Sequence, residues 1–363
     1  MDVLSDRALN RATLARQLLL RRRRRSAVET VERLAGLQAQ EPLDPYLALW
    51  SRLDGFRPQE LADALEGREV VRTVLMRGTI HLATGDDAFA LRPLVQPVLD
   101  AELRRHPEFG PALHGIDLGP PVAAARELLA ERPLTPRELR AEFADRFPRL
   151  DAGALAYACR NQLTLVQVPP RGLWGRTGGV RLATADSWLR RGPAGKPSID
   201  ALVLRYLAAF GPAAVADAAT WSRLTGLRAA FERLRPRLVT FRDERGRELF
   251  DLPDAPRPDP ATPAPPRFLP QYDNVLLSHA DRSRFAAAPE HRALLADAWW
   301  GAHGSLLVDG AVRAVWRADD QALVVRHAGS LSKRAAAAVA AEGRRLLRFL
   351  GRDTRDVRLE ALG

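Results

Sequence analysis

The order in which helix and strand signals recur is the feature that most limits how this chain can fold. Three stretches each predict short helices followed by two strands that flank a turn. The third stretch is the clearest, because Thr225-Gly226 forms a corner between two helical segments. A helix–turn–helix followed by a short hairpin is typical of a winged helix. The helices expected in this stretch are 199–210, 214–223 and 227–234, and the strands are 237–241 and 248–252.

The first two stretches end in similar short sequence segments, which indicates a repeated unit. Residues 80–86 read Ile-His-Leu-Ala-Thr-Gly-Asp, and residues 180–186 read Val-Arg-Leu-Ala-Thr-Ala-Asp. Ser26 with Glu29, and Thr135 with Glu138, have the spacing of a capping box, so a helix should begin at each pair. The first stretch predicts helices at 6–25, 26–37, 45–53 and 58–65, and strands at 70–76 and 79–84. The second predicts helices from 121, from 136 and over 152–162, and strands at 163–168 and 180–184.

The C-terminal part has a different character. A Pro-rich linker over 253–266 has no periodicity. Strands are expected at 275–277, 304–308, 311–316 and 322–326, and a closing helix at 330–350. We therefore predict an α+β fold, mostly α, with three tandem winged-helix modules and a β-rich C-terminal subdomain closed by a helix. The expected boundaries are 1–118, 119–195, 196–254 and 267–363.

Composition excludes several classes of protein and site. The sequence has no run of 18 apolar residues and no secretory signal, so we expect a cytoplasmic protein without a membrane partner. Cys159 is the only cysteine, which rules out disulfides and cysteine-based metal clusters. The histidines lack metal-ligand spacing, and no glycine-rich turn has a phosphate-loop pattern. We expect neither a metal nor another cofactor.

The net charge of +11 comes almost entirely from arginine, because only Lys196 and Lys333 among the 55 basic residues are lysines. This bias is consistent with a GC-rich genome, but guanidinium groups also bind phosphate bidentately, which suits a nucleic-acid partner. The run Arg21–Arg25 at the end of the first expected helix has two interpretations. It is a solvated face, or a phosphate clamp in which Arg22 and Arg25 contact DNA.

The triplet Gln38-Ala39-Gln40 becomes informative through its surroundings. It lies in the word Leu-Ala-Gly-Leu-Gln-Ala-Gln-Glu-Pro-Leu-Asp-Pro at 34–45. Two further words follow, Met-Arg-Gly-Thr-Ile-His at 76–81 and Leu-Pro-Gln-Tyr-Asp-Asn-Val-Leu at 269–276. Together they resemble the AlkZ/YcaQ family of tandem winged-helix DNA glycosylases, from about residue 5 to about residue 350. The Gln-x-Gln form is similar to the AlkZ branch, whereas the YcaQ branch has an acid at the second position.

The resemblance implies excision of N7-alkylated purines and unhooking of interstrand crosslinks, with Gln38 and Gln40 as catalytic residues. The chemistry is plausible, because an alkylated purine is already cationic and leaves without an acid catalyst. The remaining tasks are to place a water at C1′ and to stabilise an oxocarbenium-like sugar, and an amide can perform either. Which glutamine performs which task stays open. Glu41 or Asp44 is an alternative base, although Asp44 before Pro45 also suits a helix terminus.

The same resemblance suggests DNA contacts for Arg77 and His81 in the first hairpin. For His81 the alternative is a polar-face residue of that hairpin. Trp174 is a candidate for stacking on a base or sugar, or for packing within the second hairpin. The segment Tyr272-Asp273-Asn274 either borders the pocket or forms a structural turn in which Asp273 caps local amides.

We therefore expect a monofunctional DNA glycosylase that acts on N7-alkylated purines in double-stranded DNA. Bulky natural-product adducts are included, with interstrand crosslinks as a further candidate, in DNA repair or self-resistance. Lysine scarcity favours hydrolysis without lyase activity, because Schiff-base chemistry needs a nucleophilic amine. A monomer is expected. The alternative is a winged-helix transcriptional regulator without catalysis, since most winged helices regulate.

Overall fold

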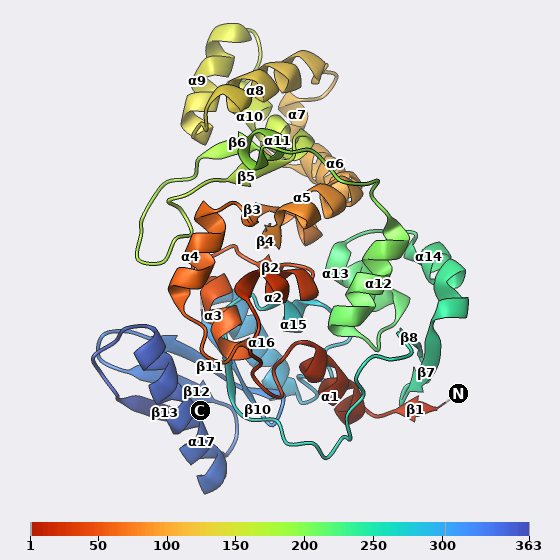
Figure 1. Cartoon of the computed structure of the whole chain (residues 1–363), viewed down its shortest axis with the longest axis vertical. Coiled ribbons are helices and arrows are strands. Elements are labelled where there is room, and N and C mark those ends of the chain that lie inside the picture. The colour runs from red at the N-terminus through yellow and green to blue at the C-terminus, as the bar shows by residue number, and fades with distance from the viewer. Residues whose placement is uncertain (1, 302, 363) are drawn as a thin grey trace.

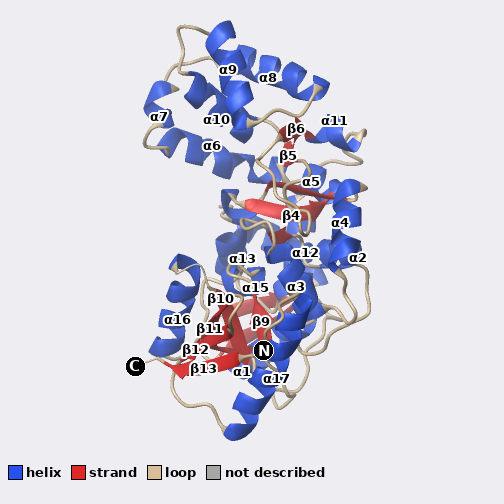
Figure 2. Cartoon of the chain, turned by 90° about the vertical axis from the view of Figure 1, so that its left-hand side faces the viewer, coloured by secondary structure: helices blue, strands red, loops and turns tan. Residues whose placement is uncertain are grey.

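The computed structural model describes residues 2–301 and 303–362 and has a mixed α+β fold that is mostly helical. Helices α8 (Gly119–Glu131), α9 (Pro136–Arg146) and α10 (Ala152–Gln162) lie at one end of the long axis (Figure 1). A C-terminal sheet and helix α17 (Lys333–Phe349) lie at the other end. Figure 2 shows a narrow middle region built around strand β4 (Ile80–Thr84). Within the described part of the chain, no helix is both long and apolar enough to cross a membrane.

The first two hairpins join in one five-stranded sheet. Strands β3 (Val70–Val74) and β4 form the first hairpin, and β5 (Leu165–Gln167) and β6 (Leu182–Thr184) form the second. Strands β3 and β5 pair antiparallel, so residues about 90 positions apart in sequence become neighbours. The short strand β2 (Leu37–Gln38) pairs with the free edge of β4. The strand order is β2-β4-β3-β5-β6, which puts the Gln-Ala-Gln motif on the edge strand.

The predicted helix starts of the first two units are confirmed by their caps. Ser26 and Thr135 each accept a hydrogen bond from the backbone of the glutamate three residues later, and that glutamate side chain accepts one from the cap backbone. The other helices of this part are α1 (Asp6–Arg16), α2 (Ala27–Arg33), α3 (Asp44–Arg52), α4 (Pro58–Glu66), α5 (Gly85–Leu91), α6 (Gln96–Arg105), α7 (Phe109–Ala112) and α11 (Ala185–Leu189).

The run Arg21–Arg25 is not helical, so the prediction of a helix over 6–25 is wrong at its end. Helix α1 stops at Arg16, and Leu18 adopts a left-handed conformation with φ 58°. The backbone N–H of Leu19 then donates to the carbonyl of Leu14, which is the Schellman pattern of helix termination. The turn buries Leu18 and Leu19, and their burial outweighs continuation of a helix into charged residues.

The third unit follows the predicted order. Helices α12 (Ile199–Phe210), α13 (Val215–Ser222) and α14 (Leu227–Leu234) precede strands β7 (Val239–Asp243) and β8 (Glu248–Asp251). The corner between α13 and α14 contains Gly226 at φ 74°, a conformation that glycine adopts readily. The N-terminal strand β1 (Val3–Leu4) pairs with β7 and so ties the start of the chain to this unit.

The C-terminal sheet has the order β13-β12-β11-β10-β9. The segment 275–277 is not one of its strands, which corrects the prediction. Asp273 accepts a hydrogen bond from the Val275 N–H and caps the short helix α15 instead. Helix α16 and strands β9 and β13 were not expected from the sequence. The elements of this part are β9 (Arg267–Leu269), α15 (Asn274–Leu277), α16 (Pro289–Trp300), β10 (Gly304–Val308), β11 (Ala311–Ala318), β12 (Leu323–His327), α17 and β13 (Val357–Ala361).

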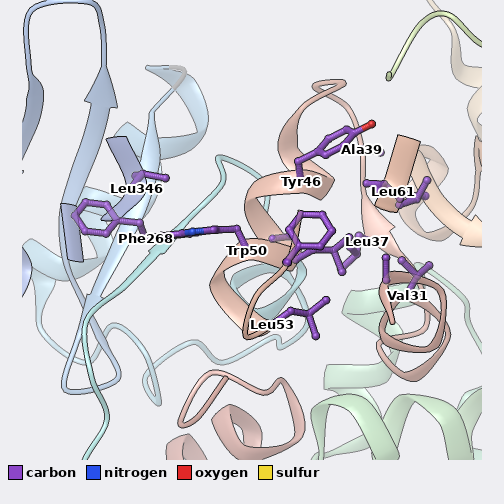
Figure 3. Packing of buried hydrophobic residues seen from close by; sticks show 14 of the residues in the cluster. Val31, Leu37, Ala39, Tyr46, Trp50, Leu53, Leu61, Phe268 and Leu346 are labelled. Atoms are coloured by element: carbon purple, nitrogen blue, oxygen red, sulfur yellow. The ribbon is translucent and has the colours of Figure 1, made fainter. Parts of the chain in front are cut away.

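One hydrophobic core joins the N-terminal helices to the C-terminal sheet. Tyr46 and Trp50 of α3 pack in the same cluster as Phe268 and Leu346 (Figure 3). A buried, bidentate ion pair between Arg52 and Asp273 connects the same two parts, with both N–O distances at 2.7 Å. Helix α3, which follows the Gln-Ala-Gln motif, is therefore fixed to the C-terminal part of the chain.

Candidate functional site

The Gln-Ala-Gln motif lies on and just after the edge strand β2. Leu37 and Ala39, which alternate with the glutamines, are buried in the shared core (Figure 3). The backbone of Ala39 is held on both sides, because its N–H donates to Ile80 O at 2.8 Å and its carbonyl accepts from Arg72 Nη2 at 2.9 Å. Strand alternation and these two hydrogen bonds fix the directions in which the two glutamine side chains project.

The two glutamines have different surroundings. Gln38 is only 7% exposed, and its Oε1 accepts a hydrogen bond from Arg77 Nη2 at 2.6 Å. Gln40 is exposed, and its side chain has no hydrogen-bond partner among the residues that the structure describes. Gln40 borders a cavity of about 270 Å³. One amide is therefore held rigidly, and the other is free to bind a small molecule such as water.

Arg77 connects the motif to two distant parts of the chain. It sits in the turn between β3 and β4 in a left-handed conformation, with φ 60°. Its Nη1 donates to Trp221 O at 2.8 Å, and its Nη2 lies 3.3 Å from Asn274 Oδ1. Asn274 in turn donates to Gly36 O at 3.0 Å. The predicted DNA contact of Arg77 is not supported, because its guanidinium is occupied by protein acceptors.

His81 lies opposite Gln38 in the β2–β4 pair and has 0% of its surface exposed. The predicted DNA contact of His81 is therefore not supported, because its ring is buried next to the guanidinium of Arg77. Burial, and then the charge of Arg77, lower the pKa of His81 to about 3. The neutral ring donates from Nδ1 to Thr79 O at 3.0 Å, which leaves Nε2 as an acceptor 3.4 Å from Arg77 Nη2.

The two carboxylates near the motif differ in burial. Asp44 is 6% exposed, and its Oδ2 has no hydrogen-bond partner. Burial, followed by the charges of Glu41 and Asp273, raises the pKa of Asp44 to about 8. Asp44 is therefore mostly protonated at neutral pH, and Glu41 lies exposed in solvent. This disfavours the alternative in which Asp44 acts as the base.

Arg22 and Arg25, both predicted to contact DNA, differ sharply. Arg22 lies over the Trp50 ring at 4.5 Å and donates to Glu342 Oε1 at 2.6 Å, with 9% of its side chain exposed. This correction follows from the extended backbone of 21–25, which turns Arg22 inward. Arg25 is exposed and borders a basic groove of about 1040 Å³. The other arginines of that groove are Arg21, Arg23, Arg24, Arg33 and Arg257.

Trp174 and the 272–274 segment have structural contacts. The Trp174 ring packs against Tyr46 and Phe349, with centroid distances of 5.1 Å and 5.3 Å. These contacts favour packing within the protein over stacking on a base. Asp273 is bound by Arg52, whereas Asn274 belongs to the Arg77 network. The sequence offered no signal for that network beyond the two matching words that contain Arg77 and Asn274.

Among residues 2–301 and 303–362, no group of three or more His, Cys, Asp and Glu side chains is placed to hold a metal ion. Beside the exposed Glu41 carboxylate, the polar groups at the motif are the amides of Gln38 and Gln40, the guanidinium of Arg77 and the imidazole of His81. Amides position water and polarise bonds without a formal negative charge.

Comparisons with known proteins identify a family and a similar fold. A sequence model described as DNA glycosylase AlkZ-like matches residues 31–349. The solved structure of Streptomyces sahachiroi DNA glycosylase AlkZ is similar, with a TM-score of 0.82 and 23% identity over 98% of this chain and 100% of that chain. A search of curated proteins found no match. Because the family model covers most of its length, the chain belongs to the AlkZ-like DNA glycosylase family.

Proposed function

We propose that the protein is a monofunctional DNA glycosylase that hydrolyses the N-glycosidic bond of N7-alkylated purines. The observation that carries this proposal is the pair of unlike amides at one sheet edge, one held by Arg77 and one free beside a cavity. Family membership supports a DNA substrate. A preorganised amide next to a free amide suits a reaction in which the leaving group already carries positive charge.

In this mechanism Gln40 places the water. Its free Oε1 accepts a hydrogen bond from a water that attacks C1′, the C1′–N9 bond breaks, and the alkylated base leaves as a neutral molecule. The proton released by the water passes to solvent, because Asp44 is protonated and Glu41 is exposed. Gln38 contributes the dipole of an amide that Arg77 holds still. Catalysis is then mainly positioning.

DNA binding in this proposal uses the three helix–hairpin units as winged-helix modules, over 1–118, 119–195 and 196–254, followed by the 267–363 subdomain. The basic groove that contains Arg25 supplies guanidinium groups for phosphates. Bulky natural-product adducts are included among the substrates, with crosslinks as a further candidate, in repair or self-resistance. The protein acts as a monomer without a cofactor.

The test is base release from a duplex that contains N7-methylguanine, followed by alkali to cut abasic sites. We expect strand breaks with the unaltered protein and their loss in the Gln38→Ala, Gln40→Ala double variant. Gln321→Ala, at an exposed glutamine far from the motif in sequence, is the matched control and should retain activity. Breaks that form before alkali treatment would contradict a hydrolytic mechanism. Tight binding to one operator without base release would instead identify a transcriptional regulator.

A further inference from the structure

The cavity beside Gln40 combines apolar walls with positive charge. Seven of its lining residues are apolar, among them Leu163, Leu165, Val180 and Leu182 from the second hairpin. Four are arginines, namely Arg72, Arg92, Arg160 and Arg171. Ligand pockets commonly have this composition, with a largely apolar surface and a few polar groups that set orientation.

Two of these arginines carry buried donors without an acceptor. Arg72 is 1% exposed and its Nη1 has no hydrogen-bond partner, and the same holds for Nε of Arg171. Within the described residues, none of the four cavity arginines belongs to an ion pair. A buried guanidinium donor left unpaired costs free energy, so it needs an explanation. Both guanidinium groups line the cavity, so their positive charge favours a ligand that brings an acceptor oxygen into it.

Two acids lie near Arg72, Glu41 and Asp44, and within the described residues neither forms an ion pair with a cavity arginine. Asp44 is mostly protonated at neutral pH because its pKa is about 8. Arg72 stays charged, since burial and then the charge of Arg171 lower its pKa only to about 10. The cavity is therefore electrostatically unfavourable for a cation and favourable for an acceptor group.

The covalent structure of the damaged nucleotide would put its N7 substituent beside Gln40 and this cavity. Only N9 and C8 separate C1′ from N7, so a purine whose C1′ faces Gln40 has its N7 substituent close to the same side chain. A phosphate group alone would make no favourable contact with the seven apolar residues that line the cavity. The observations therefore favour a ligand with an apolar body and a polar oxygen.

We propose that this cavity binds the substituent on N7 of the damaged purine and selects an apolar substituent that carries a carbonyl or carboxylate oxygen. The inference rests on the proposed glycosylase function and adds the class of adduct. The apolar body packs against Leu163, Leu165 and Leu182, and the oxygen is attracted by the positive charge of Arg72 and Arg171. Substituents that end in an ammonium group are excised more slowly because the arginines repel them.

The test uses the full chain in single-turnover assays on three duplexes. They contain N7-methylguanine, N7-phenacylguanine, which has an aromatic ring and a ketone, or N7-(2-aminoethyl)guanine. Val180→Trp fills the cavity from its half-buried wall, and Thr177→Trp places the same side chain on the neighbouring exposed loop as a control. We expect Val180→Trp to lower the phenacyl-to-methyl rate ratio by about tenfold or more, and Thr177→Trp to leave the ratio unchanged.

A second variant tests the charge. Arg171→Met removes a donor and a cation at similar length, and Arg176→Met, at an exposed position, is its control. The phenacyl-to-aminoethyl ratio should fall roughly tenfold in Arg171→Met alone. Melting temperatures confirm that each variant is folded.

Three outcomes would overturn the proposal. Unchanged rate ratios in both Val180→Trp and Arg171→Met would contradict the proposed adduct site without contradicting the glycosylase function. Equal slowing of all three adducts, together with weaker binding of an undamaged duplex, would identify a site for backbone phosphate. Failure of the unaltered protein to release any of the three bases would overturn the proposed function as well.

Discussion

Arg77 Nη2 lies 2.6 Å from Oε1 of Gln38, and this hydrogen bond joins the turn of the first hairpin to the edge strand that carries the Gln-Ala-Gln motif. The same guanidinium reaches Trp221 of the third unit and Asn274 next to the C-terminal sheet. The orientation of one glutamine therefore depends on contacts from three parts of the chain. In the proposed mechanism, Arg77 is therefore a positioning residue.

Arg77→Met should lower kcat for base release by about 10–100-fold with a smaller effect on KM, because Gln38 loses its fixed orientation. The diagnostic measurement is a double-mutant cycle with Gln38→Ala. If Arg77 acts through Gln38, the double variant is no slower than Gln38→Ala alone, and Arg77→Lys recovers part of the rate. Arg68→Met is the control, since Arg68 is also left-handed and donates to a backbone carbonyl, that of Trp188. Additive losses would reduce Arg77 to a residue that only stabilises the fold.

The two glutamines should respond differently to a change into glutamate. In Gln38→Glu, a carboxylate pairs with Arg77 and the amide N–H donor disappears, so the single-turnover rate should fall by about 10–100-fold. In Gln40→Glu, the exposed carboxylate still accepts a hydrogen bond from water, so the rate should stay within about tenfold of the unaltered protein. The reverse order of effects would assign water placement to Gln38.

Arg22 and Arg25 should separate into a stabilising and a binding role. Arg25→Gln should weaken binding to an undamaged duplex and lower the slope of log K against log salt by about 0.9, the value for one lost phosphate contact. Arg22→Gln should leave that slope unchanged but lower the free energy of unfolding by about 1–3 kcal/mol, because it leaves the buried Glu342 with one partner fewer. Fluorescence anisotropy at several salt concentrations and chemical denaturation give the two quantities. A salt slope that changes in Arg22→Gln would contradict its inward position.

Asp44 should make stability fall as the pH rises. Its pKa is raised from 3.8 to about 8 in the folded protein, so the folded state holds a proton that the unfolded state releases above about pH 4. Its contribution to stability is therefore fully present below that pH and is lost as the pH rises through about 8. Asp44→Asn should remove this dependence, which melting temperatures between pH 5 and pH 9 would reveal. An identical pH profile in both proteins would show that Asp44 is ionised in the fold.

Much of the local structure could be predicted from short-range signals. The capping boxes at Ser26 and Thr135 begin helices, and the corner at Gly226 lies between α13 and α14, as expected. Such signals work because hydrogen bonds and backbone conformations within a few residues control helix ends and turns. The Gln-Ala-Gln motif could also be singled out, but only through the sequence segments that surround and follow it.

The environment of each candidate side chain could not be predicted in the same way. Whether Arg22 faces inward, whether His81 is exposed and which glutamine is held depend on contacts with Glu342, Trp221 and Asn274, which are more than a hundred residues away in sequence. The Asp273 cap and the turn at Leu18 likewise overrode the strand and helix expected there. Burial and long-range hydrogen bonds set the charge and the mobility of each side chain. Neither can be predicted from local sequence, because both arise only when distant segments pack together.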